Sequence, residues 1–470
     1  MLKRYAKLLP LALALGLLTA CNKLSLPGLN PPPAEASLPE AQRAVTLPPG
    51  GSLDLPLQVQ VREAGTYTLR VALADPCATG ASNCPGWDAS RYPGVEHPRD
   101  SLTVTASGTY TLPFSVASDA LPQGTFKYLL LLEREGEKVQ ELPFYLKILA
   151  PGEKGGMEAW NFWRSYAGLP PVQEDPEWSY RAWLHSRYRV MNLDVQTPPH
   201  DEDLSHPFAS PEGREAGRRG NEWVNFWRRN GAPYWPPEEA SISWWIAAPF
   251  HRFNMVDPRA AKGGFGVYKD VGPIPDYGDG WGRTRANLPN LYGGSLTLSY
   301  LLFPVPGKPV ALARFVGREN PNPASPCDNP GQAPKPPFLT QPGLSWGSED
   351  SLNLGLPLTL QTFPSTPVDT EVLEARLMRL SDGAENPLCA FGSTQYWEPR
   401  DFWRERAIRG LKGWGAVIAL PHDPLTPGAE YEAYLKVRLG NEVKEYTWRF
   451  SVAQESGLRP LRLGPELEAP

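Results

Sequence analysis

The sequence lacks the features that mark most hydrolases and nucleic-acid-binding proteins. Its 470 residues include only six histidines and five cysteines, and 21% of the residues are charged. No stretch has the pattern of a nucleophile elbow, a P-loop or an HExxH metal site, and no cysteine spacing resembles a zinc finger. The formal net charge of −5 gives no basic excess for nucleic acid or an anionic membrane surface. We therefore expect no nucleic-acid partner.

Proline and glycine, in contrast, are abundant. The chain has 54 prolines and 43 glycines, which indicates many turns and short strands and few long helices. Its hydrophobic content of 41% is sufficient for packed cores, so the chain is not of the disordered class. A chain of this length predicts about three domains.

The N-terminus has the pattern of a targeting signal. "MLKRYAK" supplies positive charge, and "LLPLALALGLL" is apolar but too short to span a membrane comfortably. The following "LTAC" resembles a bacterial lipobox, which implies cleavage of residues 1–20 and lipid attachment at Cys21. Residues 21–42 are proline-rich and predict an extended tether. We expect a lipoprotein of the cell envelope, anchored in the membrane and facing outside the cytoplasm.

The other four cysteines suit an oxidising compartment, because an even number remains once Cys21 is set aside. Cys77 and Cys84 flank the short polar segment "ATGASN" and could close a local disulfide. Cys327 and Cys389 would then form the second disulfide, inside the C-terminal third of the chain.

Two segments alternate apolar and polar residues between turn signals, which is typical of β-sandwiches. Residues 43–150 and 339–455 are both predicted to be immunoglobulin-like β domains of roughly a hundred residues. Residues 271–338 read as an irregular Pro/Gly-rich connection with one clear strand, "GSLTLSYLLFPV", and residues 456–470 as a tail. Residues 43–150 carry no cluster of histidines and carboxylates, so a spacer or adhesive role is expected for that domain.

The middle segment, residues 156–270, differs in composition and periodicity from the segments on either side of it. It contains nine of the sixteen tryptophans, and aromatic and aliphatic residues recur in it at helical spacing. Asp175 is a candidate helix cap, with Pro176 at the first helical position. Four of the six histidines lie here, so any chemistry is expected in this segment: His185, His200, His206 and His251.

Three blocks of this segment resemble the CAP superfamily of cysteine-rich secretory, antigen 5 and pathogenesis-related proteins, in its bacterial branch. They are "WNFWRSYAGLPPVQEDPEWSYRAWLHSRYRVMN", "HDED" and "WIAAPFHRFNMVDPRAAKGGFG". The motif positions filled here are Asn161, Arg164, Gly168 to Pro171, Trp245, His251, Arg252, Asn254, Gly264 and Gly266. The resemblance implies an α/β/α sandwich with an antiparallel sheet, flanked here by the two β domains.

The resemblance also implies a cleft with two histidines and two glutamates, which in some members bind a divalent metal. His200 and His251 match the histidines. The glutamates depart from the pattern, because Gly217 is followed by arginine and Ala248 stands at the second carboxylate position. Replacement by a nearby carboxylate would depend on geometry, and the candidates are Glu202, Glu212, Glu215 and Glu222.

The residues alone leave two interpretations of this region open. In the first, a cleft contains His200, Glu202, His251, Arg252 and Asn254, and His200 and His251 bind a divalent metal such as zinc with Glu202 as a third ligand. In the second, "HDED" is a solvated acidic loop and His251 only caps a helix. We expect His185 to be packed in the protein and His206 to lie in a loop.

The sequence therefore favours a non-catalytic, lipid-anchored protein with a CAP-like domain, and it demands no cofactor. Such a protein would bind an envelope component, an apolar small molecule or another protein through the cleft. Two alternatives remain at this stage: a metal-dependent hydrolase of peptide or cell-wall material, and a structural or adhesive surface protein.

Overall fold

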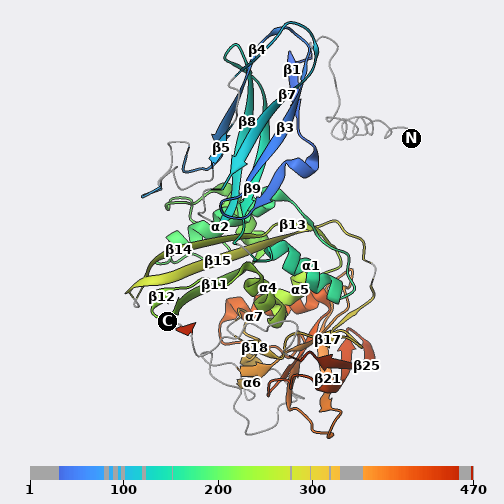
Figure 1. Cartoon of the computed structure of the whole chain (residues 1–470). Coiled ribbons are helices and arrows are strands. Elements are labelled where there is room, and N and C mark those ends of the chain that lie inside the picture. Colours follow the sequence, from blue (N-terminus) through green and yellow to red (C-terminus); the bar gives the residue numbers. More distant parts are fainter. Residues whose placement is uncertain are drawn as a thin grey trace, which may run out of the picture.

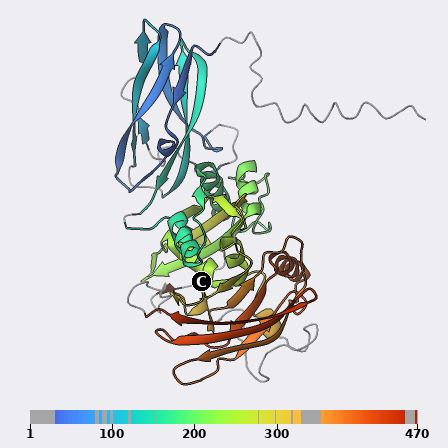
Figure 2. The ribbon, with the colours of Figure 1, turned by 90° about the vertical axis from the view of Figure 1, so that its right-hand side faces the viewer.

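The chain is arranged in three tiers, with a β-rich part at each end and a sheet with helices between them (Figure 1, Figure 2). The computed structural model describes residues 31–78, 84–87, 94–96, 101–118, 123–150, 152–275, 278–296, 298–316, 319–328, 353–454 and 467–468. The predicted signal peptide, residues 1–20, and Cys21 lie outside these ranges. Within them, no helix combines the length and apolar character that crossing a membrane requires.

The N-terminal part consists of two sheets built from alternating strands. Its strands are β1 Ala34–Ser37, β2 Ala44–Leu47, β3 Ser52–Val61, β4 Gly65–Leu73, β5 Gly94–Glu96, β6 Ser101–Val104, β7 Gly108–Ala117, β8 Gly124–Arg134 and β9 Glu137–Ile148. The sheet orders are β1-β3-β7-β5 and β2-β9-β8-β4-β6. Every second residue of β3 from Leu55 to Val61 is buried, and the rings of Phe114 and Phe144 connect the two sheets at 5.4 Å. Strand β1 lies within the segment expected to be an aperiodic tether, because its alanines pack into this core.

The central part contains a seven-stranded sheet. Its strands are β10 Gln173–Glu174, β11 Gly220–Arg229, β12 Ala232–Pro233, β13 Ala260–Gly263, β14 Gly266–Ile274, β15 Gly278–Tyr292 and β26 Leu467–Glu468. The order is β10-β13-β15-β11-β12, with β14 also paired to β15 and β26 to β11. Strand β15 therefore pairs with three other strands. It lies in residues 271–338, which we expected to be irregular. Its glycines and its proline are not typical of a strand, although its residues from Asn287 to Asn290 are all buried.

Five helices accompany this sheet: α1 Gly156–Tyr166, α2 Pro176–Met191, α3 Pro211–Arg219, α4 Glu238–Ala247 and α5 Pro249–Met255. The predicted start of α2 is confirmed, because the Asp175 carboxylate accepts the N–H of Glu177 at 3.1 Å and Pro176 begins the helix. Helix α2 lies very close to β14, since a Cβ atom at Gly266 would be 2.0 Å from the backbone nitrogen of Trp183. Glycine at this motif position is thus required for packing.

The C-terminal part has two four-stranded sheets, a two-stranded ribbon and two helices. The elements are β16 Leu301–Phe303, β17 Pro309–Val310, β18 Arg314–Val316, α6 Ser325–Asp328, β19 Asn353–Gly355, β20 Leu358–Gln361, β21 Thr370–Arg379, β22 Leu388–Phe391, α7 Asp401–Trp414, β23 Val417–Pro421, β24 Glu430–Leu439 and β25 Glu442–Val452. The orders are β16-β20-β23-β22, β17-β25-β24-β21 and β18-β19. Helix α7 was not expected, because only Ala407 and Leu411 are buried along it.

Both predicted disulfides are confirmed. Cys77 is bonded to Cys84, and Cys327 is bonded to Cys389. The second disulfide joins α6 to β22 inside the C-terminal part. Both pairs suit an oxidising compartment.

The three tiers share hydrophobic cores. Tyr180, Trp183 and Leu184 of α2 belong to the core of the N-terminal part, and the buried guanidinium of Arg187 binds the Asp75 carboxylate at 2.7 Å. On the other side, α5 packs against α7, with ring centroids of Phe253 and Trp414 5.1 Å apart. The central part therefore packs against both the N-terminal and the C-terminal part, through α2 and α5.

Candidate functional site

A buried histidine of α2, His185, lies between two carboxylates. Its Nδ1 is 2.8 Å from Oε1 of Glu202, and its Nε2 contacts Oε1 of Glu222. Burial lowers the pKa of His185, but the negative charges of Glu222 and Glu202 outweigh burial and raise this pKa to about 9. His185 is therefore a buried imidazolium, packed as expected, and neither of its ring nitrogens is available to a ligand.

Glu202, which we expected to join His200 as a third ligand, is turned inward instead. Its side chain is fully buried; Oε1 binds His185, and Oε2 accepts the backbone N–H of Ser210 at 2.8 Å. Ser210 in turn caps α3, because its hydroxyl oxygen accepts the N–H of Gly213 at 3.0 Å. The positive charge of His185 explains this position, since it compensates a carboxylate that would otherwise be costly to bury.

Gly217 of α3 controls the position of two histidines. A Cβ atom there would be 2.3 Å from Cε1 of His185, so only glycine lets α3 lie over that imidazole. The carbonyl oxygen of Gly217 also accepts a hydrogen bond from Nδ1 of His200 at 3.0 Å. Gly217 is the residue that is followed by arginine where the family resemblance implied a glutamate.

His200 is half-buried and neutral at physiological pH. Its pKa is lowered to about 4: burial is the main cause, Glu222 opposes the shift, and the charge of Arg406 on α7 adds to it. Because a carbonyl oxygen can only accept, the hydrogen bond to Gly217 places the ring proton on Nδ1. Nε2 therefore carries a lone pair, and no described residue forms a hydrogen bond with it.

His251 is fixed by a carboxylate that the sequence did not reveal. Oε1 of Glu319 accepts both the backbone N–H and the Nδ1–H of His251, each at 2.7 Å. Glu319 is buried, while the His251 side chain is 17% exposed and its ring stacks on Trp245 at 6.4 Å. As in His200, Nδ1 is engaged, and Nε2 has no hydrogen-bond partner among the residues described.

We call His200, His251, Glu222 and Glu319 the histidine cluster. The structure brings His200 close enough to Glu222 and His251 for their charges to affect its pKa. Each carboxylate of the cluster uses Oε1 for a histidine and leaves Oε2 buried without a hydrogen-bond partner in the described part of the chain. Such an oxygen is costly to bury unpaired. The cluster thus has two ring nitrogens and two buried carboxylate oxygens without a hydrogen-bond partner among the described residues.

The cluster does not form a ready metal site. In the ranges that the structure covers, no three histidine, cysteine, aspartate or glutamate side chains are placed to hold an ion. Two imidazoles and two carboxylates are the ligand types that zinc takes, but Glu222 and Glu319 already bind histidines.

Arg252 and Asn254, predicted cleft residues, hold the backbone in place. The buried Arg252 guanidinium donates to the carbonyl of Pro357 at 2.8 Å and lies 4.1 Å from the ring centre of Phe303. Asn254 donates its side-chain N–H to Oδ1 of Asn221 at 3.3 Å. Arg252 thus connects α5 to the backbone at Pro357, and Asn254 connects α5 to Asn221 of β11.

The remaining predicted positions lie outside the cluster. Ala248 is buried at the junction of α4 and α5. Glu212 is exposed, and Glu215 binds Arg181 at 2.7 Å. His206 lies in a loop beside Asp203, as expected.

Two residues of the site were not predicted from the sequence: Glu319 and Arg406. Glu319 lies in the segment expected to be irregular and follows no motif. Arg406 lies on α7, which the sequence did not predict. Because both come from outside the middle segment, only the tertiary structure could bring them to His200 and His251.

Comparisons with known proteins agree with the central part of this description. The model of the cysteine-rich secretory protein family, CAP, matches residues 157–272. No curated protein matches the sequence. This family match covers α1 to α5 and most of β14, and hence His185, His200, Glu222 and His251.

The similar solved structures are distant. A PapD-like domain of human CEP192 is 15% identical over 29% of this chain and 98% of its own, with a TM-score of 0.20. A point mutant of the SrpA adhesin of Streptococcus sanguinis is 10% identical over 31% of this chain and 68% of its own, with a TM-score of 0.19. These scores are too low to indicate a shared fold. The family match alone identifies the middle of this chain as a CAP domain, a domain of generally extracellular proteins, placed between two β-rich parts.

Proposed function

We propose that this protein is a lipid-anchored, extracytoplasmic binding protein that holds a polar group of an envelope component or partner protein at the histidine cluster. The "LTAC" pattern at Leu18 to Cys21 supports the anchor. The two disulfides and the CAP domain support a location outside the cytoplasm.

The observation that carries the binding role is the shared arrangement of His200 and His251. Each ring is held through Nδ1 by a fixed acceptor, the carbonyl of Gly217 or the carboxylate of Glu319. Each Nε2 is left without a hydrogen-bond partner among the residues described. Rings fixed in this way lose little freedom when a ligand binds, which favours affinity. The charged groups around them favour a polar ligand over the apolar molecule that the sequence also allowed.

A non-catalytic role is supported by how the carboxylates are used. Glu222 is paired with the imidazolium of His185, which lowers the Glu222 pKa although burial opposes this shift. Glu319 is bonded to His251. Neither carboxylate is placed as a general base for a substrate, because Oε1 of each contacts a histidine and Oε2 of each is buried away from the surface.

The binding experiment compares single variants of the full chain. We expect purified protein to bind soluble peptidoglycan fragments or detergent-solubilised envelope lipids in calorimetric titrations, and His200→Ala and His251→Ala to weaken that binding. His206→Ala is the matched control, because His206 lies in a nearby loop outside the cluster. Turnover of either material that His251→Ala abolishes would refute the non-catalytic role.

A metal-dependent hydrolase is the second candidate, supported by the lone pair on Nε2 of the neutral His200. Bound zinc, measured by mass spectrometry in wild-type protein and in His200→Ala and His251→Ala, tests this candidate. Stoichiometric zinc that both substitutions remove would support it. Wild-type protein without zinc that also takes none up on addition would rule it out.

A further inference from the structure

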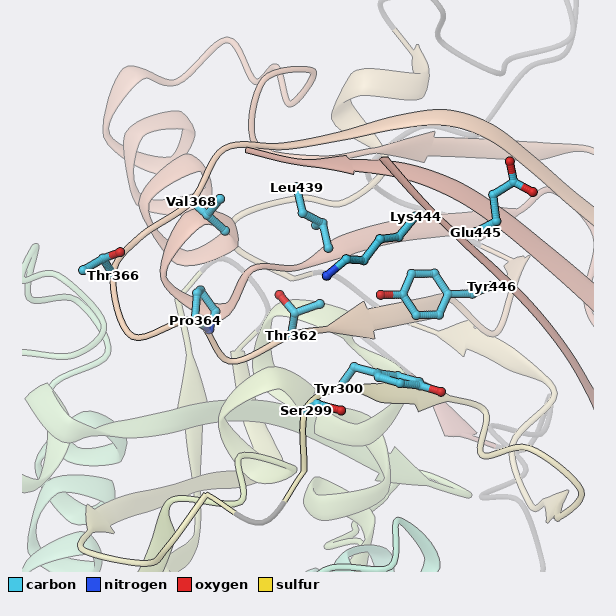
Figure 3. A pocket seen from close by; sticks show the side chains of 10 residues that line it. All are labelled: Ser299, Tyr300, Thr362, Pro364, Thr366, Val368, Leu439, Lys444, Glu445 and Tyr446. Carbon is cyan, nitrogen blue, oxygen red and sulfur yellow. The ribbon is translucent and has the colours of Figure 1, made fainter. Parts of the chain in front are cut away.

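A groove of about 680 Å³ lies in the C-terminal part and shares no lining residue with the histidine cluster (Figure 3). Three segments form it: the approach to β16, the turn after β20, and the hairpin of β24 and β25. Its lining residues are Ser299, Tyr300, Thr362, Pro364, Thr366, Val368, Leu439, Lys444, Glu445 and Tyr446.

Two tyrosines form an aromatic corner in this groove. The rings of Tyr300 and Tyr446 have centroids 5.1 Å apart and planes inclined by 64°. Tyr300 remains 46% exposed in spite of this contact, and Figure 3 shows both rings bordering the groove. The corner presents aromatic surface to a ligand.

Hydrogen-bonding groups surround the aromatic corner. Ser299, Thr362 and Thr366 contribute hydroxyls, and the ammonium of Lys444 lies toward Thr362 in Figure 3. The Thr362 hydroxyl donates to the carbonyl of Gly415 at 3.0 Å, so its lone pairs remain to accept. Lys444 forms a salt bridge to Glu442 at 2.8 Å, and an ammonium has three protons to donate.

The carboxylate of Glu445 does not face the groove. Lys444 and Tyr446 share one face of β25, whereas Glu445 is on the opposite face, since side chains alternate along a strand. The carboxylate of Glu445 binds Lys436 at 2.9 Å, and it points away from the groove in Figure 3. The groove therefore contains aromatic rings, hydroxyls and a cation.

The frame of the groove is preformed. The backbone N–H groups of Thr362 and Phe363 both donate to the carbonyl of Trp414 at 3.1 Å, and the N–H of Val368 donates to the carbonyl of Lys412 at 3.1 Å. The end of α7 thus holds the turn, while β24 and β25 are paired along their whole length. A ligand would find this site already ordered.

We propose that this groove binds a saccharide chain. A sugar ring has C–H faces that pack on aromatic rings, and its rim of hydroxyls both donates and accepts hydrogen bonds. Tyrosine serves such a ligand well, because its rigid ring offers apolar area and its phenol a polar end. An apolar ligand would cover the threonine hydroxyls and Lys444 without satisfying their remaining hydrogen-bonding capacity, at a cost in free energy.

An extended peptide is the competing ligand class. Strand β25 pairs with β17 only at Ser451 and Val452, and the carbonyl of Arg449 accepts the N–H of Gly307, so the edge before Arg449 is open within the described sheet. A peptide would bind that edge through its backbone, whereas a saccharide would depend on the rings of Tyr300 and Tyr446. The two ligand classes therefore predict different responses to tyrosine substitution.

The test uses the full chain and four probes: hexasaccharides of chitin, cellulose, xylan and polygalacturonate. We expect calorimetric titration to show binding of at least one. Tyr300→Ala and Tyr446→Ala should each weaken it about tenfold or more, as loss of a central aromatic contact does. Tyr446→Phe keeps the ring and should bind nearly as well as wild type.

Controls separate this result from misfolding and from the histidine cluster. Tyr292→Ala removes another tyrosine, 57% exposed on β15, and should leave saccharide binding unchanged. His251→Ala should also leave it unchanged, and the thermal midpoint of each tyrosine variant should match wild type. Failure to bind all four probes, or binding that survives the double substitution of Tyr300 and Tyr446, would overturn the proposal. Binding of a valine-rich hexapeptide in place of the sugars would assign the groove to peptides.

Discussion

Glu319 holds His251 by two hydrogen bonds to a single carboxylate oxygen, which is 2.7 Å from the backbone nitrogen and 2.7 Å from Nδ1. His251 belongs to α5 of the CAP domain, whereas Glu319 follows β18 of the C-terminal part. The histidine cluster is thus completed by a residue beyond the segment that matches the family model, residues 157–272.

Removing this carboxylate should destabilise the protein and release His251. For Glu319→Ala, which leaves a buried N–H unpaired, we expect a loss of about 1–3 kcal/mol in unfolding free energy, measured by urea denaturation. Glu319→Gln keeps an acceptor oxygen and should lose less. Glu158→Ala, on the exposed surface of α1, is the control and should change stability by less than about 0.5 kcal/mol. Equal stability of Glu319→Ala and wild type would contradict the structural role.

His185 should make stability fall between neutral and alkaline pH. Its pKa is about 9 in the folded protein, above its ordinary value of 6.5, although burial by itself acts in the opposite direction. Its contribution is therefore complete below pH 6.5 and is lost as the pH rises through 9, by roughly 3 kcal/mol in total. His185→Gln should flatten this part of the pH profile of unfolding free energy. A variant that keeps the wild-type slope would show that His185 is not the group responsible.

His200 should act in the opposite direction at acidic pH. Burial lowers its pKa to about 4, below the ordinary value of 6.5. Its contribution to stability is therefore present above pH 6.5 and is lost as the pH falls through 4. The imidazole signals of His200 in NMR spectra should stay those of a neutral ring with its proton on Nδ1 from pH 8 down to about 5. Titration of this ring near pH 6.5 would contradict the described environment.

Gly217→Ala should disturb both histidines at once. The added methyl group would meet the His185 ring at 2.3 Å, and the strain should cost about 1–3 kcal/mol of unfolding free energy. Gly413→Ala in α7 is the matched control, because nothing lies within 4 Å of its Cβ position. That control should stabilise the chain by about 0.5–1 kcal/mol, since alanine favours helices. Similar effects of the two substitutions would contradict the close packing of α3 on His185.

Sequence patterns sufficed where local chemistry decides the structure. The Asp175 cap and the following Pro176 correctly predicted that α2 begins at Pro176, because capping acts within the first three residues of a helix. The two disulfides are the pairs that the sequence allowed, one local and one between the two remaining cysteines, and alternation predicted strands such as β3, β24 and β25.

Sequence patterns failed where contacts between residues far apart in the sequence determine the structure. Strand β15 is buried along one stretch and therefore does not alternate, and α7 buries too few residues to show a helical stripe. In the site, the motif gave His251, but the positions of Glu202, Glu222 and Glu319 depend on burial beside a histidine from another element. Charge compensation of this kind leaves no periodic trace in a sequence.

The position of helix α2 has a consequence for how the protein unfolds. One of its faces completes the N-terminal core with Tyr180, Trp183 and Leu184, and another lies against β14 and carries His185. Neither tier can melt without exposing surface that belongs to the other, so the two should unfold as a single cooperative unit. Calorimetry should show one shared transition for them, and a stress applied to the N-terminal tier would be transmitted through one helix to His185.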